Sequence, residues 1–319
     1  MKLKTTFPDV NLKTDEGFRA YVQHIQHLLT STDPSKVSIT SDTGQIDVLT
    51  VVTPVPATPA ATTSIIYYSG FNIFRFNDGA DLDLYIKIQY GVGTSGNSTT
   101  QIGEPILRFS IGMGTDGAGN LTGVILCPER LMKGPIGGQL TGTRGSFYSY
   151  CCIQEGYLCF LMNVGGKGGS YPSTSYSYEA HVLIISQEKN GTTLTITRAN
   201  DSGTGAQSDT NKQRDCVTMV SDIYRPELSY TFFSTIVGDI PMPGNTGVQG
   251  GNVWIRPVEV VGYDGPYLDN NLICYFQNDF TNQAEHSVEV NGVTGNFLFL
   301  TPALRTTYPD YMNIAVRWE

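Results

Sequence analysis

The sequence predicts a mainly β protein: an antiparallel β-sandwich or jelly-roll-like body, preceded by one amphipathic helix near the N-terminus. Charged residues make up only 15% of the 319 residues, whereas Gly and Tyr reach 35 and 18, a composition that suits turns and half-buried strands. Short runs of alternating apolar and polar residues recur along the chain between Gly, Asn and Asp. No strand pattern alternates with a helix pattern, which disfavours a parallel α/β fold.

The helix is expected over residues 14–30. Thr14 or Asp15 can cap its first turn, where backbone N–H groups need acceptors. We expect its apolar stripe to pack on the β body or on a neighbouring subunit, as an assembly helix. Residues 1–35 would then be an N-terminal arm, and their removal would weaken assembly without unfolding the body. The stripe consists of six side chains at helical spacing: Phe18, Tyr21, Val22, Ile25, Leu28 and Leu29.

Residues 36–319 are expected to form the sandwich body, with a candidate subdivision near the polar segment 200–212. The clearest strand is 82–90, because its apolar residues recur at every second position. The prolines within 53–59 lack N–H donors, so that segment is expected to be a connector or a sheet edge. Further strands are expected at 46–52, 65–68, 72–76, 107–111, 123–126, 157–162, 181–185, 193–197, 230–236, 253–261, 272–276, 297–300 and 314–318.

Charge and composition exclude several classes of function from what we expect of this chain. The formal net charge is -9 and the sequence holds no Lys/Arg block, which disfavours binding to nucleic acid or to a membrane surface. No apolar stretch reaches 18 residues, so membrane insertion is not expected. The start, residues 1–6, lacks the apolar region of a signal peptide. The six cysteines fit no zinc ribbon and no small disulfide scaffold, so we expect buried free thiols made in a reducing compartment.

Two segments invite a ligand-binding interpretation and are better explained as turns. The run Gly112–Gly119 lacks the Gly-Lys-Ser/Thr end of a phosphate loop, so we expect a hairpin turn. Asp78, Asp81 and Asp83 are weak candidates for a calcium site, because such loops supply oxygen ligands. The EF-hand spacing is missing, so we expect a plain turn here, with no metal and no cofactor.

No enzyme is expected. No nucleophile elbow or metalloprotease motif is present. His24 and His27 lie three apart on the helix but off the apolar stripe, so they are interpreted as solvated residues. Paired carboxylates for glycoside cleavage need no proximity in the sequence, and a polysaccharide depolymerase therefore stays open as an alternative.

A contact surface is expected from a stretch that mixes Tyr with Ser and Gly. Tyr gives a large amphipathic contact area at low entropic cost, and Ser and Gly adapt around it. We expect this surface to bind other subunits in preference to a host receptor, although some of these tyrosines can instead be strand residues. The candidate residues are Tyr148, Tyr150, Tyr171, Tyr176 and Tyr178.

One stretch carries a resemblance to a known family. Arg75-Phe76-Asn77-Asp78 is followed by Lys87-Ile88-Gln89-Tyr90-Gly91 and then by Gly114-Thr115-Asp116-Gly117-Ala118-Gly119. This stretch, residues 74–123, resembles a recurring segment in structural proteins of tailed-bacteriophage virions, a poorly characterised β-rich family associated with the tail, collar or head. The resemblance implies no catalytic residues.

What the resemblance implies is a multi-copy virion component, synthesised and assembled in the host cytoplasm. Its partners would be further copies of itself and other virion proteins, and an exposed loop would be free to contact a host glycan or receptor. A tail-associated role, as a baseplate, collar or tail-fibre component, is the first hypothesis. A capsid decoration protein is one alternative, and a carbohydrate-binding module or depolymerase is the other.

Overall fold

The computed structural model describes residues 1–7, 10–57, 66–79, 82–94, 102–123, 127–133, 147–165, 181–187, 193–201, 214–222, 225–235, 255–262, 265–275, 284–290, 293–300 and 313–319. The helix α1 spans Asp15–Thr32. The strands are β1 (Lys2–Thr6), β2 (Val37–Ile39), β3 (Ile66–Asn77), β4 (Asp83–Thr94), β5 (Ile102–Gly112), β6 (Gly114–Thr115), β7 (Leu121–Thr122), β8 (Cys127–Lys133), β9 (Phe147–Gln154), β10 (Tyr157–Gly165), β11 (His181–Gln187), β12 (Thr193–Asp201), β13 (Arg214–Asp222), β14 (Arg225–Thr235), β15 (Ile255–Gly262), β16 (Gly265–Tyr275), β17 (Ala284–Val290), β18 (Val293–Leu300) and β19 (Asn313–Arg317).

The strands form antiparallel sheets, which confirms the mainly β prediction. The main sheet has the order β1-β9-β10-β11-β12-β13-β14, and the front sheet has the order β2-β3-β4-β5-β8. A C-terminal sheet has the order β15-β16-β19-β18-β17, and β6 pairs with β7 in a small ribbon. Most neighbours within a sheet are consecutive in the chain, as in a meander. Of the two predicted variants, the sandwich therefore describes the body better than a jelly roll, which is built from Greek keys.

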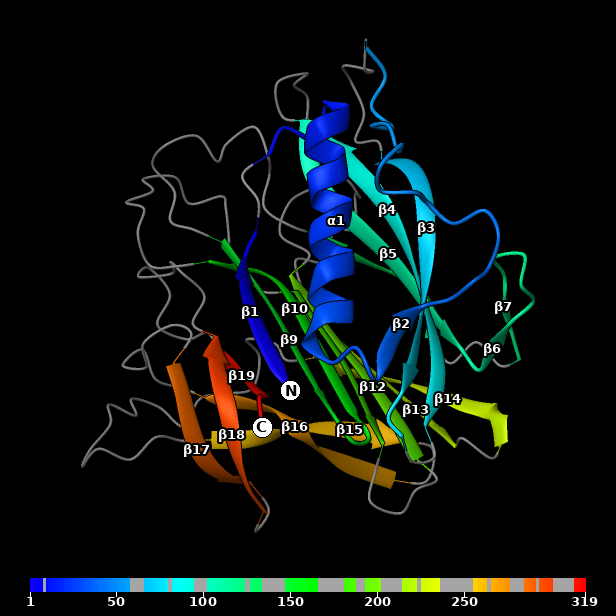
Figure 1. Cartoon of the computed structure of the whole chain (residues 1–319). Coiled ribbons are helices and arrows are strands. Elements are labelled where there is room, and N and C mark those ends of the chain that lie inside the picture. Colours follow the sequence, from blue (N-terminus) through cyan, green and yellow to red (C-terminus); the bar gives the residue numbers. More distant parts are fainter. Residues whose placement is uncertain are drawn as a thin grey trace.

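The main and front sheets pack face to face around one apolar core. Ile86, Ile88 and Phe109 of the front sheet meet Leu158 and Phe160 of the main sheet there. The helix α1 runs lengthwise beside both sheets, against β1, β9 and β2 (Figure 1). The core is thus closed on one side by the helix.

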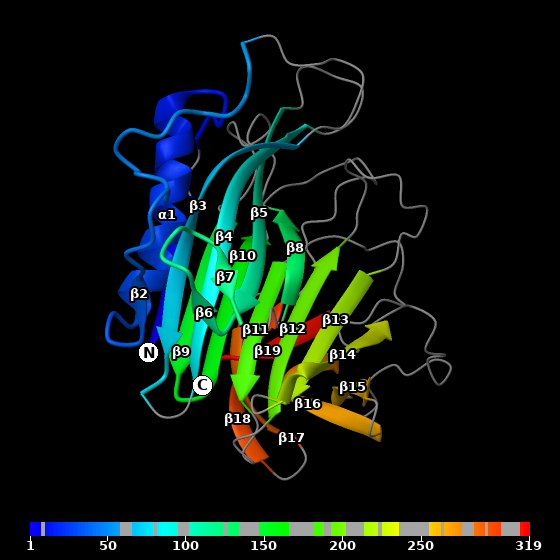
Figure 2. The ribbon, with the colours of Figure 1, turned by 90° about the vertical axis from the view of Figure 1, so that its right-hand side faces the viewer.

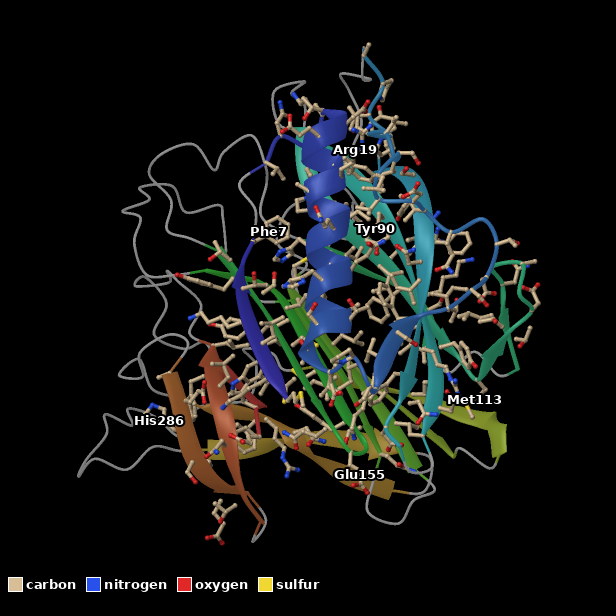
Figure 3. All side chains as sticks on the ribbon, viewed as in Figure 1. Phe7, Arg19, Tyr90, Met113, Glu155 and His286 are labelled. Carbon is tan, nitrogen blue, oxygen red and sulfur yellow. The ribbon has the colours of Figure 1, made fainter. Side chains whose placement is uncertain are left out.

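The six apolar side chains of α1 are buried in this same core, with 0–2% of their surface exposed. The ring of Tyr21 lies 6.1 Å from those of both Phe7 and Tyr90, and its hydroxyl donates to the Ile106 carbonyl over 2.9 Å. Figure 3 labels Phe7 and Tyr90 on opposite sides of the helix. The amphipathic helix is confirmed, but its stripe is covered by the chain's own sheets. The prediction that the stripe serves as an assembly surface is therefore corrected.

Thr14 is the residue that caps the helix. Its hydroxyl oxygen accepts a hydrogen bond of 3.1 Å from the Gly17 amide. Gly17 is required at this position, because an added Cβ would lie 2.0 Å from the Asn11 carbonyl oxygen. Asp15 instead accepts from the Thr53 amide over 2.9 Å and holds the following loop against the helix.

The N-terminal segment is part of the body and not a separate arm. β1 pairs with β9 from Lys2↔Cys152 to Thr6↔Tyr148, which makes it the edge strand of the main sheet. β12 and β13 pair up to Asp201↔Arg214, so the strands on both sides of the proposed subdivision belong to one sheet. The chain therefore continues within one body across both predicted boundaries, the one after residue 35 and the one near 200–212.

The main sheet is covered on its second face as well. Leu158 and Phe160 point into the first core, whereas their neighbours Cys159 and Leu161 are buried on the opposite face. There the Tyr157 hydroxyl donates to the Arg317 carbonyl over 2.5 Å, and the ring of Tyr150 packs edge-on against that of Trp318 at 5.4 Å. The C-terminal strands lie around the lower end of the main sheet (Figure 2). The body therefore has a third layer that the sequence did not predict.

The segment predicted as a strand at 46–52 is a turn. The Asp47 side chain accepts from the Leu49 amide over 2.9 Å, and its carbonyl accepts from the Thr50 and Val51 amides. These local bonds replace the cross-strand bonds that a strand would need. The predicted strands 65–68 and 72–76 are one strand, β3, with an irregularity in register between Tyr68 and Phe71.

His24 is not the solvated residue that the sequence suggested. Its Nε2 lies 2.9 Å from the Ser149 hydroxyl oxygen, and its ring packs edge-on against Phe7 at 5.1 Å. Burial lowers the pKa of His24 to about 4, with a smaller contribution from His27. His27 is exposed, as predicted.

This environment predicts an acid-sensitive fold. The folded-state pKa lies below the ordinary value of 6.5, so the unfolded chain binds the proton first as the pH falls. The contribution of His24 to the free energy of unfolding should therefore be fully present above pH 6.5. It should fall by up to about 3 kcal/mol as the pH decreases towards 4. Urea unfolding at several pH values measures this. His24→Gln should remove most of the slope and His27→Gln should keep it; equal slopes in both variants would contradict the assignment.

Candidate contact surface and the hairpin clasp

The run Gly112–Gly119 forms the predicted hairpin. The Asp116 carboxylate accepts from the Ala118 and Asn120 amides over 2.8 and 3.0 Å, and from the Asn120 side chain over 2.8 Å. Gly117 and Gly119 have φ values of 75° and 90°, which glycine adopts without strain. Strand β7 follows this turn, where a phosphate loop would open a helix. The hairpin prediction is confirmed.

This hairpin is clasped onto the outer face of the front sheet. Lys87 donates to the Gly119 carbonyl over 2.7 Å, and its Nζ lies 4.1 Å from the centre of the Phe71 ring. The Thr43 amide donates to the Gly117 carbonyl over 2.9 Å, and the Gly119 amide donates to Asp42 Oδ1 over 3.3 Å. Residues of the resembling stretch are thus engaged in holding the scaffold together.

Asp42 lies at the centre of the clasp. Burial on its own would raise the pKa of Asp42, but hydrogen bonds with Thr40, Thr115 and the Gly119 amide bring that pKa below its ordinary value. The carboxylate therefore stays charged and keeps accepting these bonds. Its role in the structure is to join the loop after β2 to the β6–β7 ribbon.

A matched pair of glycine substitutions tests the clasp. A Cβ at Gly119 would lie 2.4 Å from Phe71 Cζ, whereas a Cβ at Gly117 would meet nothing within 4 Å. Both positions have positive φ. Gly117→Ala should therefore lower the free energy of unfolding only by the strain of an alanine in this backbone conformation, about 1–2 kcal/mol. Gly119→Ala adds displacement of the Phe71 ring and should cost about 3 kcal/mol or more. Chemical denaturation measures both; equal losses would mean that the hairpin does not sit on Phe71.

The carboxylates in the β3–β4 loop are engaged in the fold. Asp78 is 3% exposed, and its side chain accepts from the Leu82 amide over 3.1 Å and from the Gly156 amide over 2.9 Å. Asp83 forms a bidentate pair with Arg75, with distances of 2.8 and 2.7 Å. Asp81 lies outside the described residues. Among the residues that the structure describes, no three His, Cys, Asp or Glu side chains are grouped as a metal site.

A row of aromatic side chains with two lysines lies on the face of β1 and β9 that points away from the core between the main and front sheets. Tyr148 and Tyr150 follow each other on one side of β9, with ring centres 6.5 Å apart. The Lys4 Nζ lies 4.2 Å from the centre of the Tyr148 ring and 5.3 Å from that of Tyr150. Cations over aromatic faces contribute about 0.5–1 kcal/mol at exposed sites. Lys2 extends the row at 6.0 Å from the Trp318 ring.

Lys2 also joins the first strand to the C-terminal sheet. Its Nζ lies 2.9 Å from Glu285 Oε2 and 3.2 Å from Glu319 Oε2. The hydrogen bond with Glu285 is the largest of the effects that raise the pKa of Lys2. All three side chains are exposed by more than a third, so these pairs contribute little to stability and mainly set the local charge pattern.

The predicted tyrosine surface is only partly realised. Tyr148 is half-buried on β9, but Tyr150 is 2% exposed and packs on Trp318, so Tyr150 belongs to the interior. Tyr171, Tyr176 and Tyr178 lie outside the described residues. The candidate contact surface is therefore Tyr148 with Lys4 and Lys2. Sequence reasoning missed the lysines because β1 was not predicted as a strand.

Three thiols are described in the same region. Cys151, Cys152 and Cys159 are free and buried, which confirms for these three the expectation of buried free thiols. The side chains of Cys127, Cys216 and Cys274 lie outside the described part of the chain. No described helix has the length and apolar character needed to cross a bilayer.

Comparison with known proteins adds no relative. No family model, no curated protein and no solved structure matches the chain.

Proposed function

We propose that this chain is a structural protein of a tailed-bacteriophage virion, associated with the tail as a baseplate, collar or tail-fibre component. It acts by binding further copies of itself and other virion proteins, after synthesis in the host cytoplasm. The observation that carries the proposal is the resembling stretch, residues 74–123. Its motif residues Arg75, Asp78, Lys87 and Asp116 are engaged in ion pairs, loop bonds and the hairpin clasp, which fits a family known for building particles.

The surface proposed for subunit contact is Tyr148 with Lys4 and Lys2. Tyr148 offers a rigid half-buried ring of the kind that is enriched at protein interfaces, and the lysines give the polar character of an interface rim. The lysines also suit an edge strand, because they discourage indiscriminate pairing of β1 with other strands.

Contact with a host-surface glycan is the second candidate function. It is favoured by the same half-buried Tyr148, whose amphipathic ring can lie against an uncharged ligand. A subunit contact and a glycan contact would use the same residue. They differ in whether purified protein self-associates or retains host polysaccharide.

Incorporation into particles tests the proposal. Gradient-purified particles from the phage that encodes the chain should contain it at many copies by quantitative peptide mass spectrometry. The Tyr148→Ala variant should fold normally but be present in fewer copies per particle than the wild-type chain. The control Tyr85→Ala, which changes another half-buried tyrosine on the front sheet, should leave the copy number unchanged. Absence of the wild-type chain from particles would reject the virion role; equal incorporation of both variants would reject only the assigned surface.

A further inference from the structure

We propose that Cys152 and Cys159 form a redox pair, which a two-electron oxidant such as hydrogen peroxide converts from free thiols into a cross-strand disulfide. The two residues face each other directly across the β9–β10 hairpin. Directly opposite residues of antiparallel strands have Cα atoms about 4.5–5.5 Å apart, which lies within the range of about 4.4–6.8 Å found for disulfides. The backbone therefore already has the spacing that the bond needs.

The two thiols share one face of the main sheet. Cys152 Sγ donates to the Trp318 carbonyl over 3.1 Å and accepts from Gln154 Nε2 over 3.4 Å, on the side of the C-terminal sheet. Cys159 stands opposite on the same side. Both are buried, with at most 1% of their surface exposed.

Cys151 provides a contrast within the same strand. It follows the opposite side of β9 and belongs to the core between the main and front sheets. Its Sγ interacts with the Thr32 side chain at the end of α1. Because the sheet separates it from Cys159, Cys151 is not able to take part in this bond, although it is adjacent to Cys152 in the sequence.

The surroundings indicate which thiol reacts first. Burial raises the pKa of Cys152, but the hydrogen bond from Gln154, the amino group of Met1 and the Lys2 ammonium all act to lower it. Burial raises the pKa of Cys159 well above its ordinary value; a hydrogen bond with Tyr157 acts to lower it, but no cation does. The pKa of Cys152 stays above its ordinary value overall, and the thiolate is the attacking species, so the reaction should be slow at neutral pH and accelerate as the pH rises. Cys152, the thiol with nearby cations, is the initial nucleophile.

The reaction balances in two steps. The Cys152 thiolate attacks one peroxide oxygen; the O–O bond breaks, Cys152 becomes a sulfenic acid, and the departing hydroxide takes up a proton to leave as water. The Cys159 sulfur then attacks the Cys152 sulfur. The S–O bond breaks, the S–S bond forms, and a second water leaves with the Cys159 proton. Two thiols are oxidised by two electrons in total, and one peroxide is reduced to two waters.

The bond would also change the attachment of the C-terminal sheet. In the reduced protein the Cys152 S–H donates to the Trp318 carbonyl, next to the packing of Trp318 on Tyr150. Oxidation removes that donor. Hydrogen exchange in residues 313–319 should therefore become faster after oxidation, while exchange in the hairpin itself becomes slower.

The test uses the full chain treated with hydrogen peroxide and then blocked with a thiol alkylating reagent. Glu155 lies between the two cysteines, so cleavage after it gives two peptides. In the oxidised wild type these should stay joined, with a mass lower by two hydrogens than their sum, and reduction should separate them. Cys152→Ser and Cys159→Ser should lose the link, and the matched control Cys151→Ser should keep it.

Circular dichroism and thermal melting must show that each variant is folded, with Cys→Ala replacing any Cys→Ser that is not. Unlinked peptides from folded, oxidised wild type would overturn the proposal. So would a link that persists in Cys152→Ser, since Cys151 would then be the partner.

Discussion

Removal of residues 1–35 is expected to unfold the β body. The deletion takes away β1, whose partner β9 becomes an edge strand, and the whole buried stripe of α1. Burial of one such apolar side chain contributes about 1.5–3 kcal/mol, so six contribute about 9–18 kcal/mol. Domains are stable by only about 5–15 kcal/mol in total. The truncated chain should therefore show no cooperative thermal transition by circular dichroism.

Two point variants of the helix serve as controls for the truncation. Ile25→Ala removes a fully buried side chain and should cost about 2–5 kcal/mol. Gln23→Ala changes an exposed position on the same helix and should cost less than about 0.5 kcal/mol. A truncated chain that keeps a β spectrum and a cooperative thermal transition would show that the body folds without the helix, and that the apolar stripe of α1 is not part of its core.

The second large effect is expected at Asp78, in the loop that joins β3 and β4. Its carboxylate bonds the Leu82 amide of its own loop and the Gly156 amide in the β9–β10 turn, so it ties the front sheet to the main sheet. The Gly156 carbonyl in turn accepts from the Gln187 amide over 2.7 Å. Figure 3 labels Glu155, which marks this turn.

Asp78→Ala should destabilise the protein by about 2–5 kcal/mol. The Leu82 amide would lose its acceptor in a buried place and the Gly156 amide in a partly buried one, and an unsatisfied buried group costs about 1–3 kcal/mol. Asp83→Ala is the matched control, because it removes the same side chain from the other end of the loop. Its pair with Arg75 is exposed by 40% or more, so its loss should cost at most about 1 kcal/mol. Equal losses in urea titrations would show that Asp78 does not join the two sheets.

The parts of the fold that could be predicted are those with a local signal. The stripe of α1 and the alternation within β4 each follow from one short segment, and the hairpin at Gly117 and Gly119 follows from glycine's access to positive φ. The prediction of a strand at 46–52 was wrong because Asp47 forms hydrogen bonds within its own turn. These bonds outweigh the alternation of apolar residues around it. Short polar edge strands such as β1 and β17 have no apolar run and were not predicted.

The layering depends on contacts between distant parts of the chain. The run over 157–162 predicted a buried strand, but only the third sheet explains why Cys159 and Leu161 are as buried as Leu158 and Phe160. Tyr150 was expected on the surface for the same reason: its cover, Trp318, lies 168 positions further along the sequence. The candidate surface followed from composition, and composition does not state that Trp318 covers Tyr150 while Tyr148, on the same side of β9, stays half-buried.

The proposed virion role is tested most directly by locating the chain in intact particles. Antibodies against the recombinant protein, followed by gold labelling and electron microscopy, should mark the tail, at its tip, collar or fibres. Label spread over the head would instead indicate a capsid decoration protein. Absence of label from every particle, with the antibody shown to bind the folded protein, would contradict a virion role and return attention to activity on carbohydrates.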